Sequence, residues 1–412
     1  MKFKIDKPIR LIELFGGISC QAQALLNLGF DFENYRYCDF DKYACQSHNE
    51  IMETNDKPSD ITNWKGKDLG VCNTDKYCYI MTYSFPCTDL STAGKMAGME
   101  RGSGTRSGLL WEVERLLKEC NELPQVLLME NVTQVHGKKN KASFDKWCQF
   151  LESLGYKNYW KDLNAKDYGV PQSRNRCFMV SLLGDYSYEF PEPIELKLKL
   201  QDLLEDEVDE KYYISDKMIA YLDKKVEQGW KKTIINNTEI ANTICNPARN
   251  QINDNWIADK EIKLNQVAQI TDKGFTEMTG RVYDSNGLSP TIQTMQGENR
   301  QPKILLKTNK KRQRELANKI DLAKDNQFLD FYNQTAQTNI AGTITTRVDA
   351  SNSTGVYKDC RIRKLTPTEC LRLMGVRDEY SKRMTCSNAQ KYKQAGNGIV
   401  VDVLMAIFKQ ML

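Results

Sequence analysis

The sequence predicts an α/β protein with a doubly wound, mostly parallel sheet and an inserted, mixed and β-rich second domain. Short β-rich runs alternate with helical patterns over about the first 180 residues, as in βαβ units. From about Asp185 to Asp359 this alternation fades and Asn, Gln and Thr become frequent. Helical patterns then return. We expect residues 1–184 and 361–412 to form one domain and residues 185–360 the second.

The first βαβ unit is expected near the N-terminus. Ile9 to Phe15 reads as a strand, and Gly16-Gly17 interrupts it. A helix is predicted from Gln21 to Leu28, because Gly29 stops its pattern. The next strand, Tyr35 to Cys38, ends in Asp39.

Further strands and helices follow in the same order. Tyr79 to Tyr83 and Val126 to Met129 read as strands, separated by an amphipathic helix from Leu109 to Cys120. Another helix is expected from Phe144 to Leu154, and a late strand from Asn175 to Leu183.

The insertion carries a faint repeat. Three Thr-Ile pairs are each followed within about ten residues by an arginine, namely Arg249, Arg300 and Arg347. Repeated hairpins and chance both account for this spacing. The segment from Lys307 to Lys319 is basic and reads either as a phosphate-tracking run or as a solvated helix face.

The C-terminal segment reads as helical. Pro367 sits at a favourable first helical position after Thr366. Ala395-Gly-Asn-Gly398 leads into an apolar helix from Ile399 to Met411. We expect this segment to return to the first domain.

Composition narrows the class of protein. The chain has 412 residues, 40% of them hydrophobic, and no apolar run long enough for a membrane span. The N-terminus lacks the apolar stretch of a signal peptide, so we expect a cytoplasmic location. The 13 cysteines then read as free thiols, and with two histidines we expect no metal site. A net charge of +4 does not by itself demand a nucleic-acid partner.

A cysteine and a glutamate follow two of the predicted strands. Ser84-Phe-Pro-Cys87 comes directly after one strand, and Glu130-Asn-Val132 after the next. In open parallel sheets, ligands bind at the carboxyl ends of the strands. The pair indicates nucleophilic catalysis by Cys87, with Glu130 as its acid/base partner.

A second group of residues suggests a nucleoside pocket. The turn at Gly16-Gly17 lets a ligand approach the backbone, but it lacks a dinucleotide or phosphate-loop pattern. Asp39 is placed to hold the two hydroxyls of a ribose, and Phe40 to stack on a purine. Asp60-Ile61 is expected to reach an adenine amino group. Together they fit an adenosyl ligand without phosphates, which points to S-adenosylmethionine.

Six motifs, in order, make the chain resemble the DNA cytosine-5 methyltransferases, in the bacterial and phage type. The resemblance covers nearly all of residues 9–184 and 361–412. It rests on Glu13-Leu-Phe-Gly-Gly17, Ser84-Phe-Pro-Cys87, Met129-Glu-Asn-Val132, Gln172-Ser-Arg-Asn-Arg176, Arg363-Lys-Leu-Thr-Pro-Thr-Glu-Cys370 and Ala395-Gly-Asn-Gly398. It implies the S-adenosylmethionine-dependent methyltransferase fold, with the insertion as the target-recognition domain.

The resemblance also implies roles for single residues. Cys87 would attack C6 of a flipped-out cytosine, Glu130 would bind N3 and the exocyclic amine, Arg176 would bind O2, and Arg174 would lie beside it. The cofactor would contact Phe15, Gly17, Ile18, Asp39, Phe40, Asp60, Ile61, Pro86, Leu109 and Asn397. Double-stranded DNA would contact Ser91 and Arg106, in a glycine-rich loop expected to close over it, and Arg249, Arg300 and Arg347.

The chain departs from the family's motifs at two places, and we consider two alternative functions. Thr88-Asp89 follows the cysteine where the family often has glutamine, which puts a negative charge near DNA, and Gly398 stands where serine is common. An RNA (tRNA) cytosine-5 methyltransferase is one alternative, although the insertion of about 170 residues is large for that branch. The other is a DNA-binding regulator with vestigial catalysis. We expect a monomer, with a cognate restriction endonuclease as a candidate partner.

Overall fold

The computed structural model describes residues 1–90, 97–212 and 360–411, together with six short strands at 266–269, 281–284, 303–307, 327–330, 335–338 and 354–356. Ser91, Arg249, Arg300 and Arg347 lie outside the described residues, as does most of the basic segment that begins at Lys307. Among the helices that the structure describes, none is long and apolar enough to cross a membrane.

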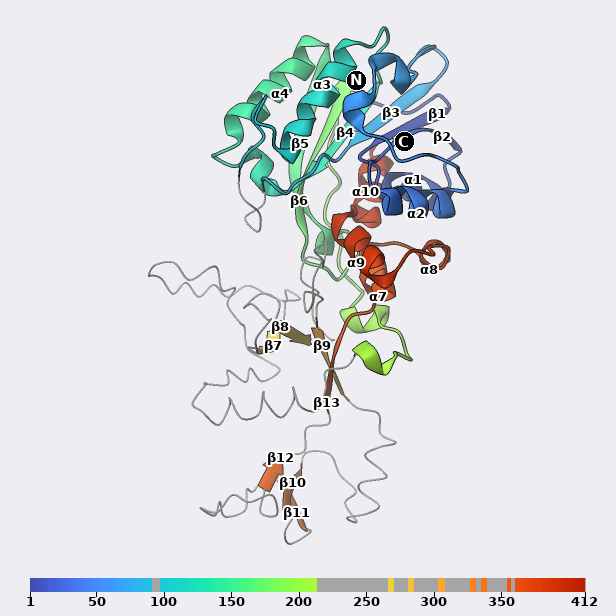
Figure 1. Ribbon diagram of the computed structural model, residues 1–412. Coiled ribbons are helices and arrows are strands. Elements are labelled where there is room, and N and C mark those ends of the chain that lie inside the picture. The colour runs from blue at the N-terminus through green and yellow to red at the C-terminus, as the bar shows by residue number, and fades with distance from the viewer. Residues whose placement is uncertain are drawn as a thin grey trace.

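A six-stranded mixed sheet organises the main domain, in the order β2-β1-β3-β4-β6-β5 (Figure 1). The strands are β1 (Ile9–Leu14), β2 (Phe32–Cys38), β3 (Cys78–Tyr83), β4 (Val126–Asn131), β5 (Tyr156–Asn164) and β6 (Asn175–Leu183). Pairings between β1, β2, β3 and β4 are parallel, which confirms the mostly parallel sheet. β6 is antiparallel to both β4 and β5, so it alone is reversed.

Strand β5 is absent from the expectations above. Its sequence, YKNYWKDLN, mixes charged and aromatic residues, and most of its positions are only partly buried. It is an edge strand, paired with β6 alone in this sheet. Edge strands tolerate polar residues, so they give a weak hydrophobic signal.

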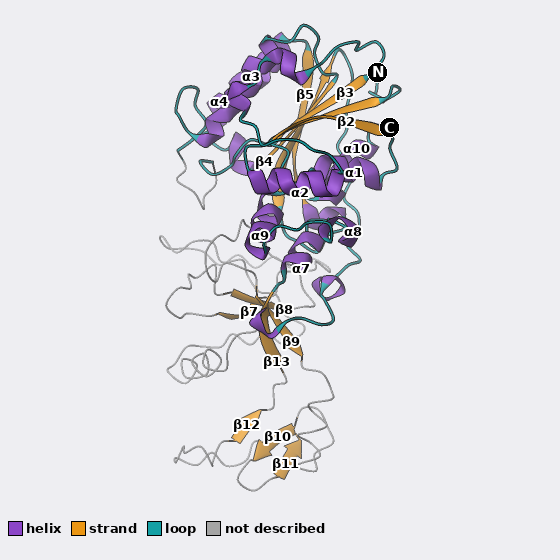
Figure 2. Cartoon of the chain, turned by 45° about the vertical axis from the view of Figure 1, so that its right-hand side comes forward, coloured by secondary structure: helices purple, strands orange, loops and turns teal. Residues whose placement is uncertain are grey.

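Helices cover both faces of the sheet, as the doubly wound prediction requires (Figures 1 and 2). One face packs on α3 (Leu110–Lys118) and α4 (Lys141–Ser153), and the other on α1 (Cys20–Asn27), α2 (Lys42–Met52) and α10 (Val401–Lys409). Successive residues of β4 face opposite sides of the sheet, as in a strand that is buried on both faces. Leu127 and Met129 face α3 and α4, whereas Val126 and Leu128 face α1 and α10.

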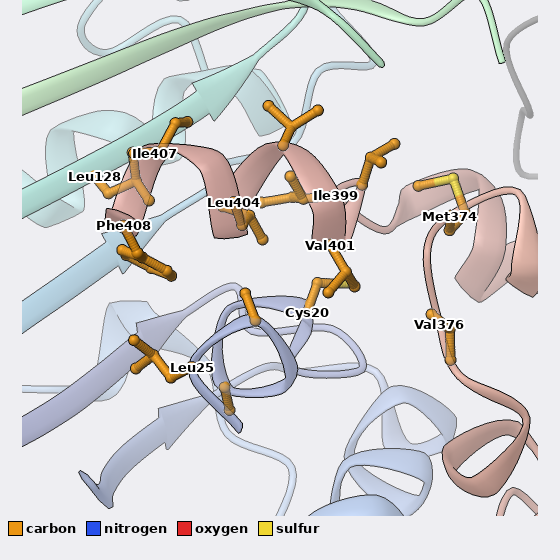
Figure 3. Close-up of a cluster of buried hydrophobic side chains, with 14 of the residues drawn as sticks. Cys20, Leu25, Leu128, Met374, Val376, Ile399, Val401, Leu404, Ile407 and Phe408 are labelled. Carbon is orange, nitrogen blue, oxygen red and sulfur yellow. The ribbon is translucent and has the colours of Figure 1, made fainter. Parts of the chain in front are cut away.

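The C-terminal segment completes this domain. It comprises α7 (Pro367–Arg372), α8 (Asp378–Ser381), α9 (Asn388–Asn397) and α10. The predicted start of α7 is confirmed, because Thr366 and Glu369 form a capping box around Pro367. In Figure 3, Leu404, Ile407 and Phe408 of α10 pack with Leu25 of α1 and Leu128 of β4.

Removing the Phe408 side chain is expected to destabilise the main domain strongly. Phe408 is fully buried in the cluster of Figure 3. A Phe408→Ala change should lower the free energy of unfolding by about 3–5 kcal/mol, because a cavity replaces a close-packed ring. Urea denaturation would measure this, with Lys409→Ala, an exposed position, as the matched control. An equal effect of both variants would contradict the packing role of α10.

The insertion contributes strands to two further sheets. β7 (Gln266–Gln269), β8 (Arg281–Asp284), β9 (Lys303–Lys307) and β13 (Cys360–Lys364) form one, and β10 (Gln327–Asp330), β11 (Thr335–Thr338) and β12 (Thr354–Val356) the other. β13 pairs antiparallel with β9 and leads directly towards α7. The return to the main domain therefore starts from a strand of the insertion's own sheet.

Candidate active site

The turn after β1 adopts an unusual backbone conformation. Phe15, Gly17 and Ser19 have φ of 57°, 58° and 56°, in the left-handed region that non-glycine residues rarely occupy. Gly16 must be glycine for a different reason, since a Cβ there would lie 2.6 Å from the ring of Tyr37. A Cβ on Gly17 would meet nothing within 4 Å, so the turn presents open backbone at the sheet edge.

Asp39 is tied to this turn. Its carboxylate accepts hydrogen bonds from the amides of Gly17 (2.9 Å) and Asp41 (2.9 Å). Burial raises the pKa of Asp39, and these two bonds oppose the rise. Beside it, the Phe40 ring is 67% exposed, which is unusual for a phenylalanine and leaves a face for stacking. The structure thus ties Asp39 to the turn, and Phe40 follows it directly in the chain.

The remaining predicted cofactor residues occupy different environments. Asp60 caps a short 3-10 helix, accepting from the amide and hydroxyl of Thr62 at 2.9 and 2.8 Å. The Ile61 side chain is buried in the core, so only its backbone is available to a ligand. Leu109 is partly buried against the same core.

Side-chain hydrogen bonds hold the backbone of the Cys87 loop at two points. Asn131 Nδ2 donates to the Phe85 carbonyl at 2.9 Å, which joins the ends of β3 and β4. Ser107 Oγ donates to the Pro86 carbonyl at 2.7 Å. Cys87 itself is partly exposed. Burial and the charge of Glu130 raise the pKa of its thiol.

Glu130 and Arg176 face each other across neighbouring strands. Glu130 Oε1 lies 3.4 Å from Arg176 Nε, which makes an ion pair but is too long for a good hydrogen bond. That oxygen is buried without a hydrogen-bond partner. Burial raises the pKa of Glu130, and Arg176 and Arg174 oppose the rise. Because β6 is antiparallel to β4, the beginning of β6 reaches the same sheet edge as the end of β4.

Arg174 is buried and binds the C-terminal segment. Its Nη2 donates to the carbonyls of Gly396 (3.3 Å) and Gly398 (2.8 Å). Burial lowers the pKa of Arg174 to about 9, and the charge of Arg176 adds to the effect. Arg174 therefore connects the Glu130 region to the end of α9. Asn397, between those two glycines, is exposed.

A small cavity separates these side chains from α10. Its volume is about 10 Å³, room for a single water, and its lining includes Glu130, Arg174, Arg176 and Val400. A larger cavity of about 280 Å³ lies elsewhere, lined by Arg372, Arg377, Asp402 and neighbours. None of the predicted site residues lines this larger cavity.

Asp89 has a structural role that its sequence position did not reveal. Its carboxylate accepts from the amides of Arg106 (2.9 Å) and Ser107 (3.3 Å), and its carbonyl accepts from Gly98 N at 3.0 Å. The expected negative charge near DNA is thus directed at backbone amides. Arg106 itself is exposed.

Gly398, the other departure, is also explained by packing. A Cβ at this position would lie 3.1 Å from the Gln394 carbonyl and 3.4 Å from Cys20 Sγ. A serine here would need its neighbours to shift by a few tenths of an ångström. At this contact, Cys20 of α1 packs against Gly398.

Sequence reasoning missed several residues that hold the site together. Asn131 and Ser107 position the Cys87 loop, and the only available signal was their adjacency to the motifs.

His136 Nε2 bonds to Asp162 at 2.9 Å, and together with Cys177 they place three possible metal-ligand atoms within 4.8 Å of one another. The His136–Asp162 hydrogen bond accounts for this grouping, and we assign no metal to it.

The site fits an adenosyl ligand on observations of its own. Ser84 Oγ is buried without a hydrogen-bond partner, and Gly17 faces open space. Phe40 offers an exposed ring, and Asp39 an acid, at the end of the neighbouring strand β2. β1 lies between β2 and β3 in the sheet, so these groups meet at the topological switch point where α/β proteins bind ligands.

Replacing Glu13 with glutamine is expected to flatten the pH dependence of stability. Glu13 lies fully buried one residue before the end of β1, and burial raises its pKa from 4.5 to about 8. The folded protein therefore keeps a proton that the unfolded chain loses. This stabilising contribution is complete below pH 4.5 and is lost as the pH rises to about 8.

The wild-type free energy of unfolding should thus fall over that interval by roughly 4 kcal/mol more than that of Glu13→Gln, at about 1.4 kcal/mol per pKa unit. Urea denaturation at pH 5, 6.5 and 8 measures both slopes. Parallel slopes would show that Glu13 is ionised in the folded protein.

The family model for C-5 cytosine-specific DNA methylase matches residues 9–412. The type II methyltransferase M2.ScrFI of Lactococcus lactis subsp. cremoris is 32% identical over 333 residues, covering 80% of this chain and 65% of that protein. The orphan methyltransferase M.SPBetaI of Bacillus phage SPbeta is 26% identical, and the match covers 98% of this chain and 97% of that protein.

The orphan methyltransferase M.SssI of Spiroplasma monobiae is 50% identical over 134 residues, which are 32% of this chain and 34% of that protein. The chain thus matches less than two thirds of the length of M2.ScrFI and of M.SssI. The Dnmt2 methyltransferase of S. pombe has the same fold, with a TM-score of 0.60, 16% identity and 98% coverage of both chains. With the family model matching all but the first eight residues, the chain belongs to the C-5 cytosine-specific DNA methylase family.

Proposed function

We propose that this protein is a sequence-specific DNA cytosine-5 methyltransferase that uses S-adenosylmethionine and works in the cytoplasm on double-stranded DNA. The observation that carries the proposal is the meeting of Cys87, Glu130 and Arg176 at one sheet edge. A thiol, a carboxyl group of raised pKa and a guanidinium are the groups that attack on a pyrimidine ring requires.

Each residue would have a distinct role in the reaction of a flipped-out cytosine. The Cys87 thiolate would add to C6, and the electron pair displaced from the C5–C6 bond makes C5 nucleophilic. Glu130 would share a proton with N3 as charge develops there, and Arg176 would bind O2. After methylation, loss of the proton from C5 restores the double bond and expels the Cys87 sulfur.

The cofactor would lie at the switch point beside this group. When bound, S-adenosylmethionine supplies an electrophilic methyl group on its sulfonium. Phe40 would stack on the adenine and Asp39 would bind the ribose. The turn from Phe15 to Ile18, with Pro86 and Leu109, would enclose the rest. Asp60, the Ile61 backbone and Asn397 would complete the contacts.

The insertion would be the target-recognition domain of a doubly wound methyltransferase, acting as a monomer. Its polar composition and antiparallel β-strands support this assignment. Arg249, Arg300 and Arg347 are proposed as its DNA contacts, and Ser91 and Arg106 as contacts from the loop after Cys87.

Incubation with a labelled methyl donor tests the substrate. Duplex DNA, single-stranded DNA and tRNA would be offered separately, and labelled DNA would be sequenced after bisulfite treatment. We expect label in duplex DNA, at cytosines of one short sequence. Label in tRNA alone would favour an RNA methyltransferase, and DNA binding without any label would favour a regulator.

A further inference from the structure

His48, on α2, is fully buried, and both of its ring nitrogens have polar partners. Its Nδ1 lies 2.6 Å from Ser19 Oγ, and its Nε2 lies 3.0 Å from both Asp56 Oδ2 and Thr54 Oγ1. Its ring stacks on Tyr37, with centroids 3.7 Å apart and planes inclined by 10°. Every polar atom of this imidazole therefore has a partner.

The hydrogen positions in this network follow from its chemistry. The Asp56 carboxylate only accepts, so Nε2 carries the hydrogen and Nδ1 is the acceptor. The Thr54 hydroxyl donates to Asn49 Oδ1 at 2.8 Å, which leaves its oxygen to accept from Nε2. Ser19 must then donate its hydroxyl hydrogen to Nδ1. Burial lowers the pKa of His48, which keeps the ring neutral and Nδ1 able to accept.

Ser19 is the residue that this bond controls. It occupies the N-cap of α1 with φ 56° and ψ 49°, and its side chain makes no capping bond to the helix. A serine at an N-cap ordinarily bonds to an amide of the first turn. Here the hydroxyl bonds to His48 and also to the buried Glu13 carboxyl group. The backbone meanwhile stays in a conformation that costs an L-residue on the order of 1 kcal/mol or more.

Tyr37 extends the same support to the middle of the turn. Its hydroxyl donates to the Gly17 carbonyl at 2.7 Å, and its ring lies between Gly16 and His48. One side chain of α2 thus supports the turn twice, by a hydrogen bond at Ser19 and through the stacked Tyr37 at Gly17. His48 lies behind the turn, with its side chain fully buried.

We propose that His48 is a positioning residue for the cofactor, because its bond to Ser19 holds the Phe15–Ser19 turn in the left-handed conformation that presents the Gly17 backbone to the ligand. This inference rests on the cofactor site of the proposed function. Asp56, His48 and Ser19 have the order of a hydrolase triad, but Ser19 is fully buried and no substrate can reach its hydroxyl.

The His48→Phe variant tests the hydrogen bond while keeping a ring to stack on Tyr37. Titration calorimetry with S-adenosylhomocysteine, without DNA, would give the dissociation constant. We expect it to rise tenfold or more, while the dissociation constant for DNA and the kcat at saturating cofactor change by less than threefold. His136→Phe, at the other histidine, is the matched control and should leave cofactor affinity unchanged.

A second background separates positioning from general stability. Glycine adopts φ near 56° without strain, so Ser19→Gly should bind cofactor within a fewfold of wild type. In that background His48→Phe should have little further effect on affinity, although both backgrounds lose thermal stability alike. An equal loss of affinity in both backgrounds, or unchanged affinity in His48→Phe alone, would overturn the proposal. Failure of the wild-type protein to bind S-adenosylhomocysteine would instead refute the cofactor assignment.

Discussion

Changing Cys87 to serine should abolish methyl transfer and leave DNA binding intact. A serine hydroxyl ionises far less readily than a thiol and is a poorer nucleophile toward C6. We expect the rate of methyl transfer to fall on the order of 10⁴-fold or more, a loss typical of removing a nucleophile. Single-turnover transfer of a labelled methyl group to duplex DNA measures the rate, and gel-shift titration measures binding.

The control for this variant is another thiol. Cys72 is exposed and free, and it lies before β3, outside the Cys87 loop. Cys72→Ser should therefore keep the wild-type rate. A covalent complex with DNA containing 5-fluorocytosine should form with wild type and Cys72→Ser but not with Cys87→Ser. Methylation retained by Cys87→Ser would refute the covalent mechanism.

Changing Glu130 to glutamine should have opposite effects on methyl transfer and on Cys87 reactivity. Glutamine cannot give a proton to N3, so the rate of methyl transfer should fall by about 10²–10⁴-fold. The negative charge of Glu130 raises the pKa of Cys87, whereas Arg174 and Arg176 lower it. Without that charge the thiolate fraction rises at a given pH, and iodoacetamide should alkylate Cys87 faster.

Alkylation and methyl transfer, both measured on Glu130→Gln, test this prediction. Alkylation rates of wild type and Glu130→Gln would be compared from pH 7 to 9, alongside methyl transfer. Glu112→Gln, which removes a surface partner of Arg115, is the matched control and should alter neither rate. Alkylation that slows in Glu130→Gln would mean that the carboxyl group activates the thiol as a base.

The alternation of strands and helices was readable in the sequence because each buried strand is hydrophobic on both faces. Asn175–Leu183 was predicted at its observed bounds, and the other predicted strands of the sheet agree within a few residues. β5 was missed because an edge strand needs no continuous apolar run. The reversed direction of β6 was also not predicted, since strand direction leaves no trace in residue order.

Candidate site residues were predictable where they sit inside motifs. Cys87, Glu130 and Arg176 meet at one edge, because strand ends collect catalytic groups in this type of sheet. The clamps provided by Asn131 and Ser107, and the capping role of Asp89, depend on backbone groups far along the chain. A hydrogen bond between residues 46 positions apart cannot be inferred from local spacing.

By itself, the sequence predicted the class of fold and the candidate reactive groups, because hydrophobic period and motif order are local properties. The tertiary structure decided how those groups are tuned. Burial raises the pKa of Glu130, and Arg174 reaches the carbonyls of Gly396 and Gly398 only once the C-terminal segment has folded back. His48 supports Ser19 from a helix 29 residues away. Desolvation and such contacts arise from atoms that packing brings together, and residue order does not encode them locally.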